Sequence, residues 1–247
     1  AEYGPVCVDA DGRYDHSKAM THMPPSVPTM SGIDEPINWY FAWGLDFGYE
    51  DPFAYVLWAF SPQIADIFEM ASWKKVHLPS DAIEDIVLDI WQQVGPGLVS
   101  IRGDSGGSMA KNTIVGWQDK LKIPIEPADK HGKDTWEDLF NGELWAQRVH
   151  FRKDSVLLTE LRELQYKVKG GKREIWKTRV VNGVMHGDHC IDAGCRYAYR
   201  DLVSRRTEFG GGKPLTADEV AKAEQTRMLR ALDAGPATYD NDMKDGW

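Results

Sequence analysis

The stretch "WYFAWGLDFGYEDPFAYVLWAFSP", residues 39–62, carries the pattern that decides the fold. Its first half is rich in aromatic and aliphatic residues and ends at Asp51 and Pro52, and its second half is again apolar up to a closing proline. Such runs, bounded by turn residues, are typical of buried β-strands. A third strand is expected over residues 64–74, and the short turns predict an antiparallel meander. The first of these strands contains a carboxylate, Asp46.

The rest of the chain alternates between helical and strand patterns. We expect helices over residues 79–95, 109–121, 134–147, 155–167 and 188 to about 204, strands over 97–107, 122–128 and 148–151, and a β-hairpin over 166–179 with Gly170-Gly171 at its tip. A meander followed by crossover units predicts an α/β fold. The expected architecture is a mixed sheet flanked by helices on both faces, with an added basic β-hairpin.

The two ends of the chain lack this regular pattern. Residues 1–37 contain the turn-rich segment "MPPSVPTMSG" and are predicted to form a connector. Residues 206–247 are predicted to form a flexible C-terminal tail with one short helix. We therefore expect a single domain over residues 38–205.

Composition excludes some classes of protein. No run approaches 18 apolar residues, so no membrane partner is expected. The three cysteines show no CxxC pairing, which fits a reducing compartment. The net charge of −9 by itself argues against a nucleic-acid partner.

The charge is nevertheless distributed unevenly. The predicted hairpin is strongly basic, with Lys167, Lys169, Lys172, Arg173, Lys177 and Arg179 against a single Glu174. Lys130 and Lys133 form a second, smaller basic group. Both groups have two interpretations, which are simple solvation of an exposed segment and contact with phosphates.

The segment "HGDHCIDAGCRYAYR", residues 186–200, combines acids with an imidazole. At about 100° per residue, Asp188, Asp192 and Arg196 share one face of a helix, and His189 lies at its edge. The neighbouring face is apolar, so the helix is expected to pack on the domain. The polar face is either an N-terminal charge cluster or part of a metal site.

Three aspartates occur where strands or helices can converge. Asp46 lies inside an apolar strand, Asp104 ends the strand "SIRGD", and Asp192 lies on the last helix. A carboxylate in an apolar strand is costly unless it is paired or binds a metal. One such residue is more often structural, but three favour a metal site, and oxygen ligands suit Mg²⁺ or Mn²⁺. Two cations about 4 Å apart would activate a water and stabilise the leaving oxygen of a phosphodiester.

Three motifs together resemble a known family. The segments "GLDFGYEDP", "RGDSGG" and "DHCIDAGCRYA" occur in this order and look like the nuclease domain of the large terminase subunit. That subunit belongs to the DNA-packaging motor of tailed bacteriophages, and its nuclease domain has a ribonuclease H-like fold. The resemblance covers residues from about 40 to 205, and the third motif is the most specific.

The resemblance implies roles for particular residues. Asp46, Asp104 and Asp192 would be the catalytic acids that bind two divalent cations, Mg²⁺ or Mn²⁺. His189 would be an accessory metal ligand or proton-handling group, or would have only a supporting or capping role. The basic hairpin would correspond to a loop beside the active site that approaches DNA.

The resemblance also implies a biological context. The protein would be an endonuclease that cleaves concatemeric viral DNA during genome packaging in the host cell cytoplasm. Its partners would be double-stranded DNA, the ATPase domain of the same subunit, the portal and the small terminase subunit. The chain has no GxxxxGK[ST] motif, so we expect it to be the C-terminal nuclease portion, with residues 1–37 as the remnant that joins it to the ATPase domain.

Two other functions remain open from the sequence. The first is a ribonuclease H-like resolvase or transposase core, against which the "DHCIDAGCRYA" motif argues. The second is a non-catalytic docking domain of the packaging motor, in which the aspartates would be structural.

Overall fold

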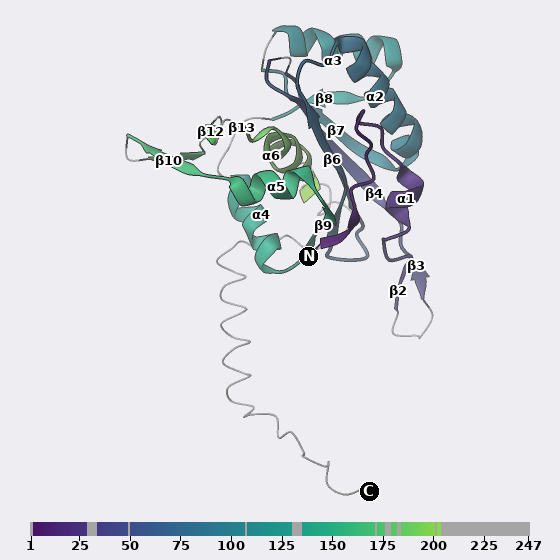
Figure 1. Cartoon of the computed structure of the whole chain (residues 1–247). Helices are drawn as coiled ribbons and strands as arrows, with labels where there is room; N and C mark the ends of the chain where they lie inside the picture. Colours follow the sequence, from purple (N-terminus) through teal and green to yellow (C-terminus); the bar gives the residue numbers. More distant parts are fainter. Residues whose placement is uncertain are drawn as a thin grey trace, which may run out of the picture.

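The computed structural model describes residues 2–28, 34–48, 50–106, 108–129, 135–170, 172–175, 179–181, 184–200 and 202–203. A seven-stranded sheet with the order β1-β9-β6-β5-β4-β7-β8 forms its centre (Figure 1). The strands of this sheet are β1 (Glu2–Pro5), β4 (Tyr40–Asp46), β5 (Phe53–Phe60), β6 (Ile67–Lys75), β7 (Leu98–Gly103), β8 (Ile125–Pro127) and β9 (Val149–Lys153). Three two-stranded pairs lie outside it: β2 (Ser26–Val27) with β3 (Glu35–Pro36), β10 (Tyr166–Lys169) with β11 (Lys172–Ile175), and β12 (Arg179–Val181) with β13 (Val184–His186).

The sheet is mixed, as predicted. β4, β5 and β6 form the antiparallel meander, whereas β7 pairs with β4 and β8 pairs with β7 in parallel. Parallel neighbours need a crossover connection. These connections contain α2 (Ser80–Val94) between β6 and β7, and α3 (Ser108–Leu121) between β7 and β8.

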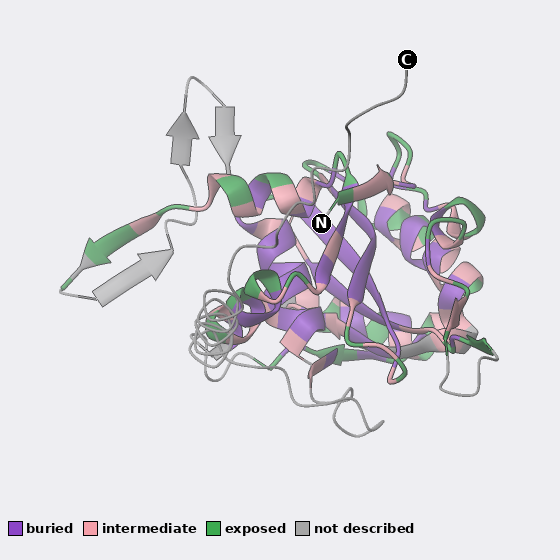
Figure 2. Cartoon of the chain, turned by 90° about the horizontal axis from the view of Figure 1, so that it is seen from below, coloured by how far each residue is buried: buried purple, intermediate pink, exposed green. Residues whose placement is uncertain are grey.

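Helices cover both faces of the sheet, which confirms the predicted fold class. On β5, Phe53, Tyr55 and Leu57 join the core under α2 and α3, whereas alternate residues such as Val56 and Trp58 join the opposite core. This alternation follows from the two-residue period of a strand. The second core lies under α4 (Thr135–Trp145), α5 (Val156–Glu163) and α6 (His189–Ile191). Figure 2 shows the central strands buried between the two layers.

The N-terminal segment differs from its prediction. Strand β1 pairs in parallel with β9, and α1 (His16–Met20) packs on the domain through the fully buried Ala19. Arg152 of β9 donates a hydrogen bond to the carbonyl of Ala19. The expected connector is therefore wrong for residues 2–28, because an edge strand and a buried arginine far along the chain fix a segment with no periodic pattern of its own. Whether this segment also joins a further domain stays a prediction.

Two helices also differ from their predictions. Helix α5 ends at Glu163, since Leu164 leaves the helical region and Tyr166 already pairs in the hairpin. The last helix is α-helical only over α6, and from Asp192 to Tyr199 it is a π-helix, η2. The pair β12–β13 was not predicted. Residues 206–247 lie outside the described part of the chain, and no helix within that part is long and apolar enough to cross a membrane.

Candidate active site

The first two aspartates lie at neighbouring strand ends. Asp46 is the last residue of β4, and its side chain is 8% exposed. The parallel register pairs Leu45 with Gly103, and the N–H of Asp104 donates a 3.0 Å hydrogen bond to the carbonyl of Leu45. Parallel strands end at the same edge of a sheet. Asp46 and Asp104 therefore share one edge, as the sequence predicts for a converging site.

Two glycines bring the π-helix onto this edge. A Cβ atom at Gly44 would overlap with the carbonyl oxygen of Ala193, and one at Gly194 would lie 3.0 Å from the side chain of Val56. Trp58 Nε1 donates a 2.9 Å hydrogen bond to the carbonyl of Gly194. The absence of side chains at both positions thus allows backbone contact between β4 and η2, which carries the third aspartate.

His189 is paired with Asp46. Its Nδ1 lies 2.9 Å from Oδ2 of Asp46. Burial raises the pKa of Asp46 to about 6; the hydrogen bond with His189 opposes this rise, and the charges of Asp192 and Asp104 add to it. Burial lowers the pKa of His189, but the hydrogen bond and charge of Asp46 outweigh it, so that the net shift is upward. This coupling shows that the three aspartates influence one another.

Asp192 is paired with a cation from its own helix. Arg196 Nη1 contacts Oδ1 of Asp192 and lies 3.9 Å from Oδ2 of Asp188. The three side chains are mostly buried. The expected grouping of these residues on one face is confirmed by their contacts, although the helix is a π-helix rather than an α-helix.

Asp104 has two hydrogen-bond donors. The N–H of Gly106 lies 2.6 Å from Oδ1, and the hydroxyl of Tyr197 donates to Oδ2 at 3.3 Å. Burial raises the pKa of Tyr197 far above its usual value, and the three aspartate charges raise it further, so the hydroxyl keeps its proton. The sequence analysis missed Tyr197. Its only signal there is its place in "CRYA", in the third motif.

The residues present fit a divalent cation by their chemistry. Carboxylate oxygens with one imidazole suit Mg²⁺ or Mn²⁺. Like charges raise the pKa of Asp46, and a cation would relieve this repulsion. Among the described residues, however, no three His, Cys, Asp or Glu side chains are grouped so that they could hold one metal ion. In this conformation Arg196 and His189 supply the positive charge beside Asp192 and Asp46.

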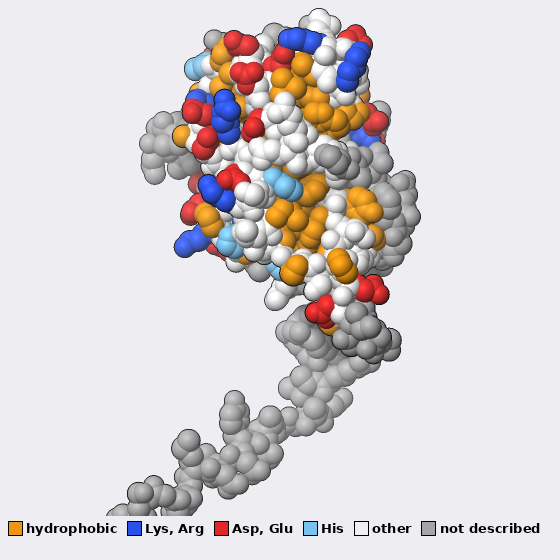
Figure 3. Space-filling model, turned by 90° about the vertical axis from the view of Figure 1, so that its right-hand side faces the viewer, with side chains coloured by type: hydrophobic (Ala, Val, Ile, Leu, Met, Phe, Trp, Pro, Cys, Tyr) orange, Lys and Arg blue, Asp and Glu red, His pale blue; other side chains and the backbone are white. Residues whose placement is uncertain are grey.

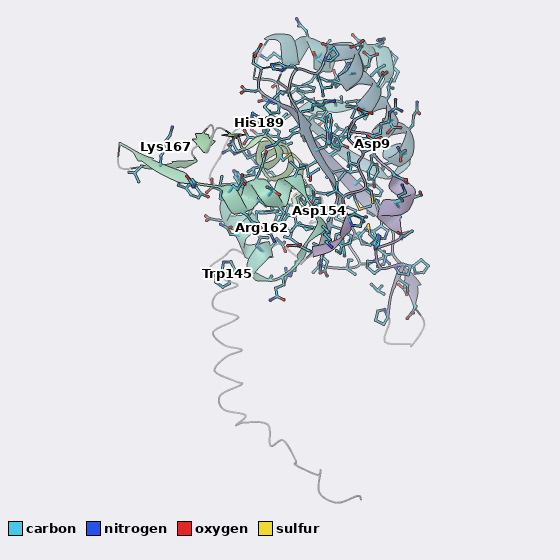
Figure 4. All side chains as sticks on the ribbon, viewed as in Figure 1. Asp9, Trp145, Asp154, Arg162, Lys167 and His189 are labelled. Atoms are coloured by element: carbon cyan, nitrogen blue, oxygen red, sulfur yellow. The ribbon has the colours of Figure 1, made fainter. Side chains whose placement is uncertain are left out.

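The predicted basic hairpin is present in the backbone. Strands β10 and β11 are antiparallel, with Lys167 opposite Glu174 and Lys169 opposite Lys172, and Gly170 at the turn has a φ of 57°. The exposed Lys167 projects from this arm, whereas His189 lies at the start of α6 (Figure 4). The side chains of the other predicted DNA-contacting residues lie outside the described part: Lys169, Lys172, Arg173, Lys177, Arg179, Lys130 and Lys133.

The side of the domain that carries α1 and α2 has a different charge pattern. Figure 3 shows that, among the residues drawn in colour, Lys and Arg side chains lie between Asp and Glu side chains on this face. The hairpin extends on the other side in Figure 1. This mixed face is therefore a poor candidate for phosphate contacts, which favours the hairpin side.

Comparison with known proteins places the fold. No protein-family model and no curated protein matches the chain. The large terminase from a thermophilic bacteriophage is similar in its crystal form 2 with a TM-score of 0.51 and 13% identity over 76% of this chain and 43% of that one. Crystal form 3 of the same terminase gives a TM-score of 0.49 and 13% identity over 76% and 44%. The large terminase nuclease domain from bacteriophage SPP1 with bound Mn gives a TM-score of 0.46 and 20% identity over 66% and 86%.

The described residues therefore form an α/β protein with a ribonuclease H-like fold. More particularly, this fold is the one seen in part of the large terminase of the thermophilic bacteriophage. The chain spans less than half the length of that terminase.

Proposed function

We propose that this protein is a metal-dependent DNA endonuclease, the nuclease portion of a large terminase. The observation that carries the proposal is the convergence of Asp46, Asp104 and Asp192 at one sheet edge, where their charges act on a single buried carboxyl group. The fold shared with the terminase of the thermophilic bacteriophage supports it.

Each residue of the site has a part in this proposal. The three aspartates would hold two divalent cations, Mg²⁺ or Mn²⁺, with His189 as an accessory ligand or as a group that holds a proton beside Asp46. The bound cations would supply an activated water and stabilise the leaving oxygen of a phosphodiester. Tyr197 orients Asp104 through its hydroxyl, and Arg196 balances the charge of Asp192.

The proposed substrate is double-stranded DNA. Lys167 and the other basic residues of the hairpin would contact phosphates, which position DNA without reading its sequence. We therefore expect low sequence specificity. In the packaging context the substrate would be concatemeric viral DNA in the host cytoplasm, and the partners would be an ATPase domain of the same subunit, the portal and the small terminase subunit.

A plasmid assay tests the proposal. Supercoiled plasmid is incubated at low salt with Mn²⁺, Mg²⁺ or EDTA, and nicked and linear products are followed. The proteins compared are wild type, Asp46→Asn in the site, and Asp119→Asn on the exposed surface of α3 as a matched control. We expect metal-dependent cleavage by wild type and the control, and its loss in Asp46→Asn with the fold preserved.

The alternatives give different results. Cleavage that persists in Asp46→Asn would exclude this site as the catalytic one. A folded wild type that neither cleaves DNA nor binds Mn²⁺ would instead indicate a docking domain. Strand transfer or junction cleavage in place of plasmid cleavage would indicate a transposase or resolvase core.

A further inference from the structure

A buried carboxylate outside the proposed metal-binding set contacts the site from a second helix. Glu160 on α5 is 3% exposed. Its Oε1 accepts a 2.5 Å hydrogen bond from Lys74 Nζ, and its Oε2 accepts one of 3.0 Å from the backbone N–H of Ile191. Ile191 lies between His189 and Asp192 in the chain, so this hydrogen bond holds the short backbone segment that carries both residues.

That segment has no side-chain support from its own start. Asp188 precedes α6 and makes no capping hydrogen bond with its side chain. N–H groups in the first turn of a helix have no partner within the helix and need an acceptor from elsewhere. Glu160 supplies one from α5, and its charge is favourable beside these N–H groups.

Helix α5 is itself fixed to the sheet. Ser155 at its start accepts a hydrogen bond from the N–H of Leu158 at 2.9 Å and donates one to the buried Glu69 at 2.8 Å. Ser72 of β6 accepts hydrogen bonds from the N–H groups of Val156 and Leu157. Glu160 is therefore held on a helix whose first turn is bound to the central sheet, and it transmits that fixed position to α6.

Lys74 belongs to the same arrangement. The strand register pairs Asp46 with Ala54 and Ala54 with Lys74, so the three residues form one row across β4, β5 and β6. Residues in one row point to the same face of a sheet. Lys74 thus balances the charge of Glu160 on the face that carries Asp46, where a further unpaired negative charge would be unfavourable.

We propose that Glu160 is a positioning residue, which holds the backbone N–H of Ile191 so that His189 and Asp192 keep the arrangement required for metal binding, with Lys74 as its counter-ion. The inference rests on the proposed function and deepens it. Residues that support metal ligands in this way typically affect metal affinity by about 10- to 100-fold.

The test measures Mn²⁺ affinity by calorimetry on the whole chain, together with hydrogen exchange of the Ile191 amide in metal-free protein. Glu160→Leu removes both contacts, and Glu160→Gln keeps one acceptor oxygen. The double variant Lys74→Met/Glu160→Leu removes the charge imbalance without restoring the hydrogen bond to Ile191. Glu143→Gln on α4 changes another buried carboxylate, 1% exposed and ion-paired with Arg148, and serves as the matched control.

We expect Mn²⁺ affinity to fall by about 10- to 100-fold in Glu160→Leu and in the double variant, less in Glu160→Gln, and not in the control. Exchange of the Ile191 amide should accelerate in the same order. If Glu160→Leu does not fold, the comparison of Glu160→Gln with Glu143→Gln decides. Unchanged affinity and exchange in the folded Glu160 variants would overturn the inference and leave the proposed function standing. A folded wild type that binds no Mn²⁺ would overturn both.

Discussion

Arg196 Nη1 contacts Oδ1 of Asp192 four residues earlier on η2, and both side chains are mostly buried, with 15% and 9% exposed. The guanidinium also lies over the ring of Trp136, 5.7 Å from its centroid. Without a metal, this pair balances one of the three aspartate charges. Removal of one partner of a buried ion pair leaves the other uncompensated, which is strongly destabilising.

The Arg196→Gln variant tests this charge balance. We expect a lower melting temperature than wild type in EDTA, because the charge of Asp192 loses its partner. Since a ligand stabilises the state that it binds, addition of Mn²⁺ should raise the melting temperature of the variant by more than that of wild type. Thermal unfolding with and without Mn²⁺ measures both effects. Equal shifts in the two proteins would contradict a charge-balancing role.

The contact between Gly44 and η2 gives a second prediction. Ala at this position would place a Cβ on the carbonyl oxygen of Ala193, which is backbone and cannot rotate away. We expect Gly44→Ala to cost about 4 kcal/mol or more, or to prevent folding. Gly116 in α3 has no atom within 4 Å of its added Cβ, so Gly116→Ala should stabilise the protein by about 1 kcal/mol. Urea unfolding of both variants provides the measurement, and similar effects would refute the packing argument.

The buried Glu69 predicts a pH dependence of stability. Burial raises its pKa from 4.5 to about 7, although hydrogen bonds from Ser72 and Ser155 oppose this. A raised pKa in the folded state means that its contribution to stability is fully present below pH 4.5 and is lost as the pH rises through about 7. At about 1.4 kcal/mol per pKa unit, the loss amounts to at most roughly 3 kcal/mol.

Glu69→Gln removes this titration and is the variant to compare. Between pH 5 and pH 8, wild type should lose more unfolding free energy than the variant, as measured by urea denaturation. Parallel pH profiles would show that Glu69 is already ionised in the folded protein at pH 5.

The hairpin predicts a salt-dependent contact with DNA. We expect Lys167→Gln to weaken binding of short duplex DNA about equally for all sequences and to reduce the slope of log affinity against log salt by about 1. Lys18 on α1 is a matched exposed lysine on the other side of the domain in Figure 1, and Lys18→Gln should leave both quantities unchanged. Fluorescence anisotropy over a range of salt concentrations measures them. An equal effect of both variants would indicate non-specific attraction only.

The local patterns that were strong in the sequence correspond to elements in the structure. The strands around Asp46, the meander and the turn at Gly170 follow from hydrophobic runs and turn residues, which act over a few neighbours. Segment 2–28 could not be predicted in this way, because its position depends on pairing with β9 and on Arg152. The π-helical form of η2 is likewise a tertiary effect, since Gly44 and Trp58 contact its backbone from the sheet.

The sequence by itself determined which residues carry the chemistry, because carboxylates in apolar surroundings and the order of three motifs can be recognised without coordinates. Only the tertiary structure decided how they are held. Asp46 meets His189, Tyr197 meets Asp104, and Glu160 meets the backbone of Ile191 across wide separations in the chain. Such contacts arise from strand register and helix packing, which depend on the whole domain at once rather than on any local run of residues.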